Sequence, residues 1–375
     1  MKRNFQILLL GLIAVLMLSV AAKGQSGSEK VEGTWEVKPE DADLYFEFST
    51  KPKDHKGNST VSEKIKRSDL TGFKNGNNIS FSLKKRGGEI VMTGDVSSDK
   101  GDGTFVFTPD NNFVKAIADE GFSGLEPQVL LMFTLKDFDP DYIKTVKNLG
   151  YKDLSKDNLI ALVALDVTLD YIKGIQKGNL KDITVSQLIS FKALGIDPAY
   201  ISSMERLSGG DLSAEDITSF AALKVDEAYA SAMYKSGYKL SGKELITFKA
   251  MGIDPEYVKE LAASGYEGLS NEDIVQFKAQ NISPDYIKEV KSMGLKEKIS
   301  ADLIIQLKIF KVTKDYIDEM GKAGYPNLSA EQLIEFKIFK IDRPFIEKAT
   351  NFVGSKPTPE KLIQLKIAEG DHSGR

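Results

Sequence analysis

An aromatic residue recurs along the last two thirds of the chain at an almost constant spacing. The nine positions are Phe113, Tyr142, Tyr171, Tyr200, Tyr229, Tyr257, Tyr286, Tyr316 and Phe345. The intervals between them are 28, 29 or 30 residues, and six of the eight are 29. A fixed period of roughly 20–50 residues is typical of stacked supersecondary units. The spacing therefore predicts an array of about nine repeats over residues 111–367.

The segment from Ile196 to Val225 shows how one repeat would fold. Asp197 suits the N-cap of a first helix, and Pro198 suits its first turn. Ser213 and Asp216 have the spacing of a capping box, which predicts the start of a second helix. The same spacing recurs at Thr184–Gln187, Ser241–Glu244, Ser270–Asp273 and Ser329–Gln332. Each repeat would hold two short helices whose apolar stripe only stacking can bury, so we expect an α-solenoid rather than separate helical subdomains.

Lysines also recur with the repeat, directly after an apolar residue of the predicted second helix. They are Lys192, Lys249, Lys278, Lys308, Lys337 and Lys366. One interpretation is a basic ridge that binds an acidic partner. The other, which we favour from the sequence, is compensation of the helix dipole near helix C-termini. The tyrosine column is likewise expected to be core rather than a binding surface.

Residues 31–110 have a different periodicity and predict a small β domain. Apolar and polar residues alternate in Thr34–Val37, Leu44–Phe48, Ile79–Leu83 and Thr104–Thr108, as in strands with one buried face. Short turns between them indicate an antiparallel meander of five to seven strands. The fold class is therefore α+β multidomain, with this β-meander followed by the solenoid.

Several boundaries follow from these patterns. We expect the two domains to fold separately on either side of Pro109–Phe113, and residues 368–375 to form a disordered tail. The cluster Asp99–Gly103 has a composition that could suggest a calcium loop. It lacks the ligand spacing of one, so we interpret it as a hairpin turn.

The N-terminus resembles a secretory signal peptide over residues 1–24. Lys2 and Arg3 precede the apolar stretch Ile7–Val20, and small residues precede a possible cleavage site after Gly24. We expect an exported protein, periplasmic or secreted; an uncleaved membrane anchor is the alternative. Removal of the segment, which contains three basic residues and no acidic one, changes the net charge from −4 to −7. Such an acidic protein is a poor candidate for binding nucleic acid.

Few residues suited to catalysis or metal binding are present. The chain has no cysteine, which excludes a lipid-modified cysteine, a disulfide and a thiol nucleophile, and it has two histidines, His55 and His372. No phosphate-binding glycine loop, nucleophile elbow or zinc-protease motif occurs in the sequence. We therefore expect no catalytic residue, no cofactor and no metal site.

Three segments together carry a resemblance to a known family. They are Gly33-Thr34-Trp35-Glu36, the stretch from Gly103 to Pro109, and the repeated pattern Gly-Ile-Asp-Pro-x-Tyr-Ile/Val. They resemble the extracytoplasmic C-terminal region of some BlaR-family transmembrane sensor peptidases, and stand-alone secreted relatives of that region. The resemblance covers most of residues 33–367 and implies no reaction. The peptidase part of that family carries a His-Glu-x-x-His zinc motif in a multi-span membrane domain, and this chain has neither.

These observations favour a non-enzymatic interaction scaffold in the bacterial envelope or outside the cell, with a protein partner or an envelope ligand. The resemblance suggests a second possibility, an accessory or sensor subunit of an envelope signalling system. A carboxylate-dependent hydrolase is a third. It would need paired acids in a cleft, whereas helix caps and turns already account for the acids seen here. The oligomeric state does not follow from the sequence.

Overall fold

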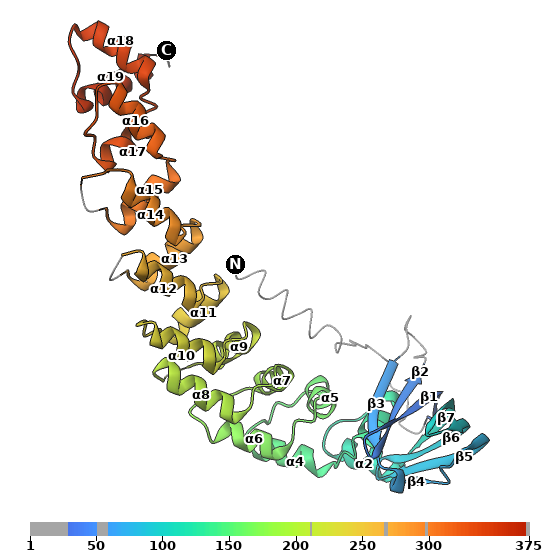
Figure 1. Ribbon diagram of the computed structural model, residues 1–375. Helices are drawn as coiled ribbons and strands as arrows, with labels where there is room; N and C mark the ends of the chain where they lie inside the picture. Colours follow the sequence, from blue (N-terminus) through green and yellow to red (C-terminus); the bar gives the residue numbers. More distant parts are fainter. Residues whose placement is uncertain (1–28, 51–58, 211, 266–268, 297–298, 373–375) are drawn as a thin grey trace. The chain divides into compact units, whose positions relative to one another are not determined.

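The computed structural model describes residues 29–50, 59–210, 212–265, 269–296 and 299–372. These residues form a seven-stranded antiparallel sheet followed by eighteen helices, the α+β fold that the sequence predicts (Figure 1). The chain divides into two compact units, the first ending at Pro198 and the second beginning at Ala199. The predicted signal peptide, residues 1–24, and His55 lie outside the described residues.

The sheet consists of two meanders that pair through the first and last strands. The strands are β1 (Val31–Glu40), β2 (Asp43–Thr50), β3 (Ser59–Ile65), β4 (Leu70–Thr71), β5 (Gly76–Lys85), β6 (Gly88–Ser97) and β7 (Lys100–Pro109). Their order is β3-β2-β1-β7-β6-β5-β4. The pairing of β1 with β7 therefore joins the meander β1–β3 to the meander β4–β7.

The two edges of this sheet are held close together. Only Lys66 to Asp69 connect β3 at one edge to β4 at the other. The five steps from Ile65 to Leu70 reach at most about 18 Å, so the sheet has to curl. Trp35 of β1 and Phe46 of β2 both contact Phe81 of β5, with ring centroids 5.2 and 6.2 Å apart. The curled sheet thus encloses an aromatic core.

The turn between β6 and β7 is a tight hairpin. Ser98 and Asp99 both have positive φ angles, 50° and 62°. Two such residues between paired strands are typical of the hairpin turns that match the twist of a sheet. The predicted hairpin is confirmed, but its turn is Ser98–Asp99, and Lys100–Gly103 already belong to β7.

The helices form nine two-helix repeats. The first helices are α2 (Asn111–Asp119), α4 (Asp141–Asn148), α6 (Leu169–Gln176), α8 (Pro198–Ser208), α10 (Glu227–Lys235), α12 (Pro255–Ala263), α14 (Pro284–Ser292), α16 (Lys314–Lys322) and α18 (Arg343–Val353). The second helices are α3 (Pro127–Leu135), α5 (Lys156–Ala164), α7 (Val185–Ala193), α9 (Ala214–Ala222), α11 (Gly242–Ala250), α13 (Asn271–Ala279), α15 (Ala301–Ile309), α17 (Ala330–Ile338) and α19 (Pro359–His372).

The helix starts agree with the sequence prediction. All five predicted capping boxes are present, at α7, α9, α11, α13 and α17. Asp254, Ser283 and Asp342 cap the first helices α12, α14 and α18, each with a proline in the first turn. One expectation was wrong: α19 continues to His372, so residues 368–372 are helical rather than part of a disordered tail.

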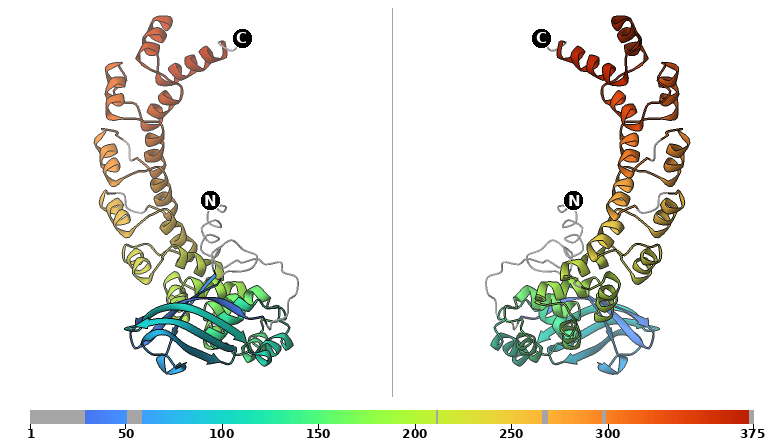
Figure 2. Two further views of the ribbon diagram at one scale, coloured as in Figure 1. Left: turned by 90° about the vertical axis from the view of Figure 1, so that its right-hand side faces the viewer. Right: turned by 90° about the vertical axis from the view of Figure 1, so that its left-hand side faces the viewer.

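Stacking of the second helices buries the core of the array. In the first unit α3 contacts α5 and α5 contacts α7; in the second unit contacts run from α9 through α11, α13, α15 and α17 to α19 (Figure 2). Each second helix from α7 to α17 has a fully buried large side chain near its C-terminal end: Phe191, Phe220, Phe248, Phe277, Leu307 and Phe336. Among the described residues, no helix is both long enough and apolar enough to cross a membrane.

Helix α3 packs against the sheet within the first unit. It contacts β1, β3 and β7. A Cβ atom on Gly87, in the turn before β6, would lie 2.2 Å from Oγ1 of the fully buried Thr134, so only glycine fits there. Lys136, just after α3, forms an ion pair of 2.9 Å with Glu63 of β3. The sheet and the first repeats therefore share an interface, and their separate folding stays a prediction.

A substitution at Gly94 tests the curled sheet. A Cβ atom there would lie 2.1 Å from the backbone oxygen of Asp102 and 2.8 Å from the ring of Trp35. We expect Gly94→Val to lower the free energy of unfolding by about 2 kcal/mol or more, because strand β7 and the indole would both have to move. Urea unfolding followed by the fluorescence of Trp35, the single tryptophan, measures this. Val91→Thr, on the exposed face of the same strand, is the control and should change stability by less than about 0.5 kcal/mol. Wild-type stability of Gly94→Val would contradict the close strand approach.

Candidate functional site

The tyrosine column ties the two helices of each repeat together. Each tyrosine lies in the first turn of a first helix, and most of their hydroxyl groups donate a hydrogen bond to the backbone carbonyl just after the second helix. The pairs are Tyr142–Val167 (2.6 Å), Tyr171–Ile196 (2.6 Å), Tyr200–Val225 (2.8 Å), Tyr229–Ile253 (2.7 Å), Tyr257–Ile282 (2.7 Å) and Tyr316–Ile341 (3.5 Å). The rings are buried or half-buried, as a core role requires. The sequence did not reveal these bonds, because donor and acceptor are 24 or 25 residues apart.

Tyr286 departs from this pattern. Its repeat is 30 residues long, one more than the common period. Its hydroxyl is buried and has no hydrogen-bond partner among the described residues. This repeat therefore contains one buried polar group that the described residues leave unsatisfied.

Burial keeps the tyrosine hydroxyls protonated. It raises the pKa of Tyr200, Tyr257 and Tyr286 to about 12, from an ordinary value of 10.0. Burial raises the pKa of Tyr142, Tyr171, Tyr229 and Tyr316 as well. These hydroxyls therefore stay protonated at neutral pH, and all but that of Tyr286 act as structural donors.

The six predicted lysines all stack on the aromatic column. The distances from Nζ to the ring centroid are 5.1 Å for Lys192–Tyr171, 4.2 Å for Lys249–Tyr229, 4.7 Å for Lys278–Tyr257, 4.2 Å for Lys308–Tyr286, 3.8 Å for Lys337–Tyr316 and 4.4 Å for Lys366–Phe345. An ammonium group over an aromatic face is stabilised by about 0.5–1 kcal/mol at a partly exposed site. All but Lys366 also lie in the last turn of a helix, as the dipole interpretation predicts.

Five of these lysines lie on successive second helices of the array. Lys249, Lys278, Lys308, Lys337 and Lys366 lie on α11, α13, α15, α17 and α19, which contact one another in that order; we call them the lysine ridge. Lys192 lies on α7, in the first unit, and is not part of the lysine ridge. Within the described part of the chain, the first four lysines of the ridge form no salt bridge with a carboxylate.

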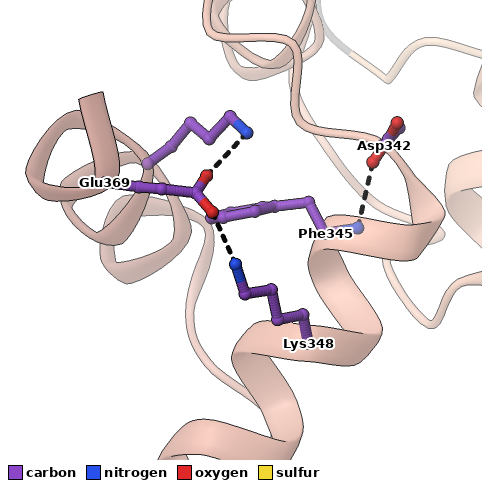
Figure 3. A network of polar contacts seen from close by, with 5 residues as sticks. Asp342, Phe345, Lys348 and Glu369 are labelled. Atoms are coloured by element: carbon purple, nitrogen blue, oxygen red, sulfur yellow. Dashed lines mark hydrogen bonds and ion pairs between the residues drawn. The ribbon is translucent and has the colours of Figure 1, made fainter. Parts of the chain in front are cut away.

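Lys366, at the end of the ridge, is neutralised by a neighbour. Glu369 lies between Lys366 (2.9 Å) and Lys348 (2.6 Å) and so joins α19 to α18 (Figure 3). Hydrogen bonds from Lys348 and then Lys366 lower the pKa of the Glu369 carboxyl to about 2. Close by, the Asp342 carboxylate accepts from the backbone N–H of Phe345 at 2.9 Å and caps α18 (Figure 3). The terminal repeat therefore differs from the other repeats of the lysine ridge in both charge and ring type.

An exposed row of isoleucines beside the ridge was missed by the sequence analysis. Ile309, Ile338 and Ile367 directly follow ridge lysines and are 49, 48 and 46% exposed. The signal was present in the sequence, because the five preceding repeats carry alanine at this position. Among the described residues, no group of three or more His, Asp or Glu side chains is placed to hold a metal ion.

The hydroxyl bonds can be tested with two matched substitutions. Tyr257→Phe removes the hydrogen bond to Ile282, and we expect it to lower the free energy of unfolding by about 0.5–1.5 kcal/mol. Tyr286→Phe removes a hydroxyl that has no acceptor among the described residues, so it should be neutral or stabilising. Urea unfolding followed by far-UV circular dichroism gives both values. An equal loss of unfolding free energy in the two variants would show that the hydrogen bond of Tyr257 does not contribute to stability.

The raised tyrosine pKa values predict a loss of stability in alkali. An unfolded tyrosine ionises near pH 10, whereas folded Tyr200 and Tyr257 ionise at about 12. Their contribution is complete below about pH 10 and is lost as the pH rises through about 12. Urea midpoints at pH 9, 10 and 11 measure the decline. Because lysines also titrate in this range, the control is the Tyr200→Phe/Tyr257→Phe variant, which should lose less stability over the same interval. An equal decline of the urea midpoint in the wild type and the variant would contradict the raised pKa values of Tyr200 and Tyr257.

Neither a scan against protein-family models nor a search of curated proteins finds a match to this chain.

Proposed function

We propose that this chain is a non-enzymatic, exported interaction scaffold that binds an acidic segment of a protein partner along the lysine ridge. One observation carries the proposal. Four successive second helices carry lysines that form no salt bridge among the described residues: Lys249, Lys278, Lys308 and Lys337. The proposed export rests on the N-terminal sequence.

The stacking of each lysine on a ring favours this role. A ring of the same repeat limits the motion of the side chain, so less conformational entropy is lost when a partner carboxylate binds. Packed helices lie about 8–10 Å apart, which sets a regular spacing of charges along the ridge. Carboxylates at a similar spacing would match it, and each contact would add a modest amount of affinity.

Charge reversal along the ridge tests the proposal. We expect the mature chain carrying Lys249→Glu, Lys278→Glu and Lys308→Glu to capture at least about tenfold less of its acidic partner from envelope extract at low salt. Single reversals should each weaken capture only partly. Raising the salt concentration should also weaken capture by the wild type, because exposed charges are screened.

The control carries the same change in net charge on the first helices. Lys235, Lys259 and Lys322 are exposed on α10, α12 and α16, and their reversal should leave capture unchanged. Equal losses in the two triple variants would show that only net charge matters and would refute the ridge. Turnover of a peptidase or glycosidase substrate that one carboxylate substitution abolishes would refute the non-enzymatic role.

A further inference from the structure

The last three second helices expose a row of large apolar side chains. Ile309, Ile338 and Ile367 on α15, α17 and α19 form what we call the isoleucine stripe, each about half exposed. These helices contact one another in sequence, so the three isoleucines lie on neighbouring helices. The half-buried rings of Phe310 and Phe339 follow its first two members.

The folding of the repeat does not require isoleucine at this position. Alanine occupies it in the five preceding repeats, at Ala164, Ala193, Ala222, Ala250 and Ala279, and the first repeat has the buried Leu135. Alanine has the highest helix propensity, and isoleucine is less favourable by a few tenths of a kcal/mol, about 0.4. The replacement therefore opposes local helix stability and leaves apolar surface in water, a combination typical of a binding surface.

Cations flank the stripe on both sides in the sequence. The motif Lys-Ile-Phe-Lys occurs at 308–311 and again at 337–340. Lys308 and Lys337 belong to the ridge, whereas Lys311 and Lys340 are exposed and have positive φ angles of 54° and 52°. The same left-handed position holds glycine in two other repeats, at Gly195 and Gly252, and a polar residue in the rest: Asp137, Asp166, Lys224 and Asn281. Polar residues are therefore common at this position, and in the two repeats with the motif it carries a second exposed cation.

We propose that the isoleucine stripe is the apolar half of the ridge surface and that its occupant is an acidic amphipathic helix of a protein partner. This inference rests on the proposed function. Apolar anchors of the partner would cover the isoleucines, and flanking carboxylates would meet the lysines on either side. Neighbouring repeats are about 8–10 Å apart, and seven residues of a helix rise about 10.5 Å, so anchors at every seventh position fit three repeats.

Two other occupants fit the charges less well. Residues 301–369 hold eleven basic and ten acidic residues, and Glu331 and Glu335 are exposed on α17. A flat negatively charged membrane would meet Glu331 and Glu335 together with the lysines, whereas a single helix along the stripe can place its carboxylates beside the lysines alone. A second copy of the same surface would place its lysines against Lys308 and Lys337, and opposed like charges disfavour such a contact.

Replacing the three isoleucines by the alanine of earlier repeats tests the inference. The probe is a labelled 21-residue helical peptide with leucine at every seventh position and glutamates beside the leucines. We expect Ile309→Ala/Ile338→Ala/Ile367→Ala, in the full mature chain, to bind it at least about tenfold more weakly, because three half-exposed side chains lose their apolar contacts. Fluorescence anisotropy measures binding, and thermal unfolding checks the fold. Val91→Ala, an exposed apolar residue of the sheet, is the control and should bind like the wild type.

Other results would overturn the inference in distinct ways. Equal binding of the triple variant and the wild type refutes the stripe; if Lys→Glu reversal on the ridge still weakens binding, the proposed function stands. Equal binding of a peptide with serine in place of leucine refutes the apolar anchors. Stripe-dependent binding to phosphatidylglycerol vesicles without peptide binding would indicate a membrane. Self-association that the triple variant abolishes would indicate a second copy.

Discussion

The array depends on the mutual burial of one large apolar side chain per second helix. Phe220, Phe248, Phe277, Leu307 and Phe336 are fully buried, although no repeat of about 29 residues could cover such a side chain alone. Each second helix is covered by the next one, so the stability of the array is shared between neighbours. The burial of this side chain also fixes the direction in which the next residue of the helix points. The residue after each buried side chain is a lysine in most repeats, and it emerges on the side where it meets the tyrosine ring of its own repeat.

The sequence predicted features whose causes are local. The repeat period, the five capping boxes and the strand segments all follow from residues within a few positions of one another. Features that depend on distant residues were not predicted. The pairing of β1 with β7 joins segments separated by most of the β domain, and the tyrosine hydroxyls reach carbonyls 25 residues away. The helix through residues 368–372 was missed because the polar, glycine-containing segment has no strong helical pattern of its own.

The candidate site shows the same division. The six lysines were identified from their spacing, but their stacking on the aromatic column could not be inferred without knowing how the two helices of a repeat pack. Stacking and dipole compensation explain why a lysine is tolerated at this position. Neither explains why the lysines on the second helices α11, α13, α15 and α17 form no salt bridge among the described residues. Neither explains why isoleucine replaces alanine next to the ridge lysine in the last three repeats. The proposed ridge surface accounts for both observations with one partner.

The unsatisfied hydroxyl of Tyr286 has a mechanical consequence. In a linear array, each repeat and each interface contributes separately to resistance against opening. The repeat of α14 and α15 lacks a bond that most of the other repeats have, and it holds a buried polar group without a partner among the described residues. We therefore expect this repeat to open with less work than the neighbouring repeats of Tyr257 and Tyr316, whose hydroxyls are bonded. A partner bound across α15, α17 and α19 would stabilise this repeat against opening.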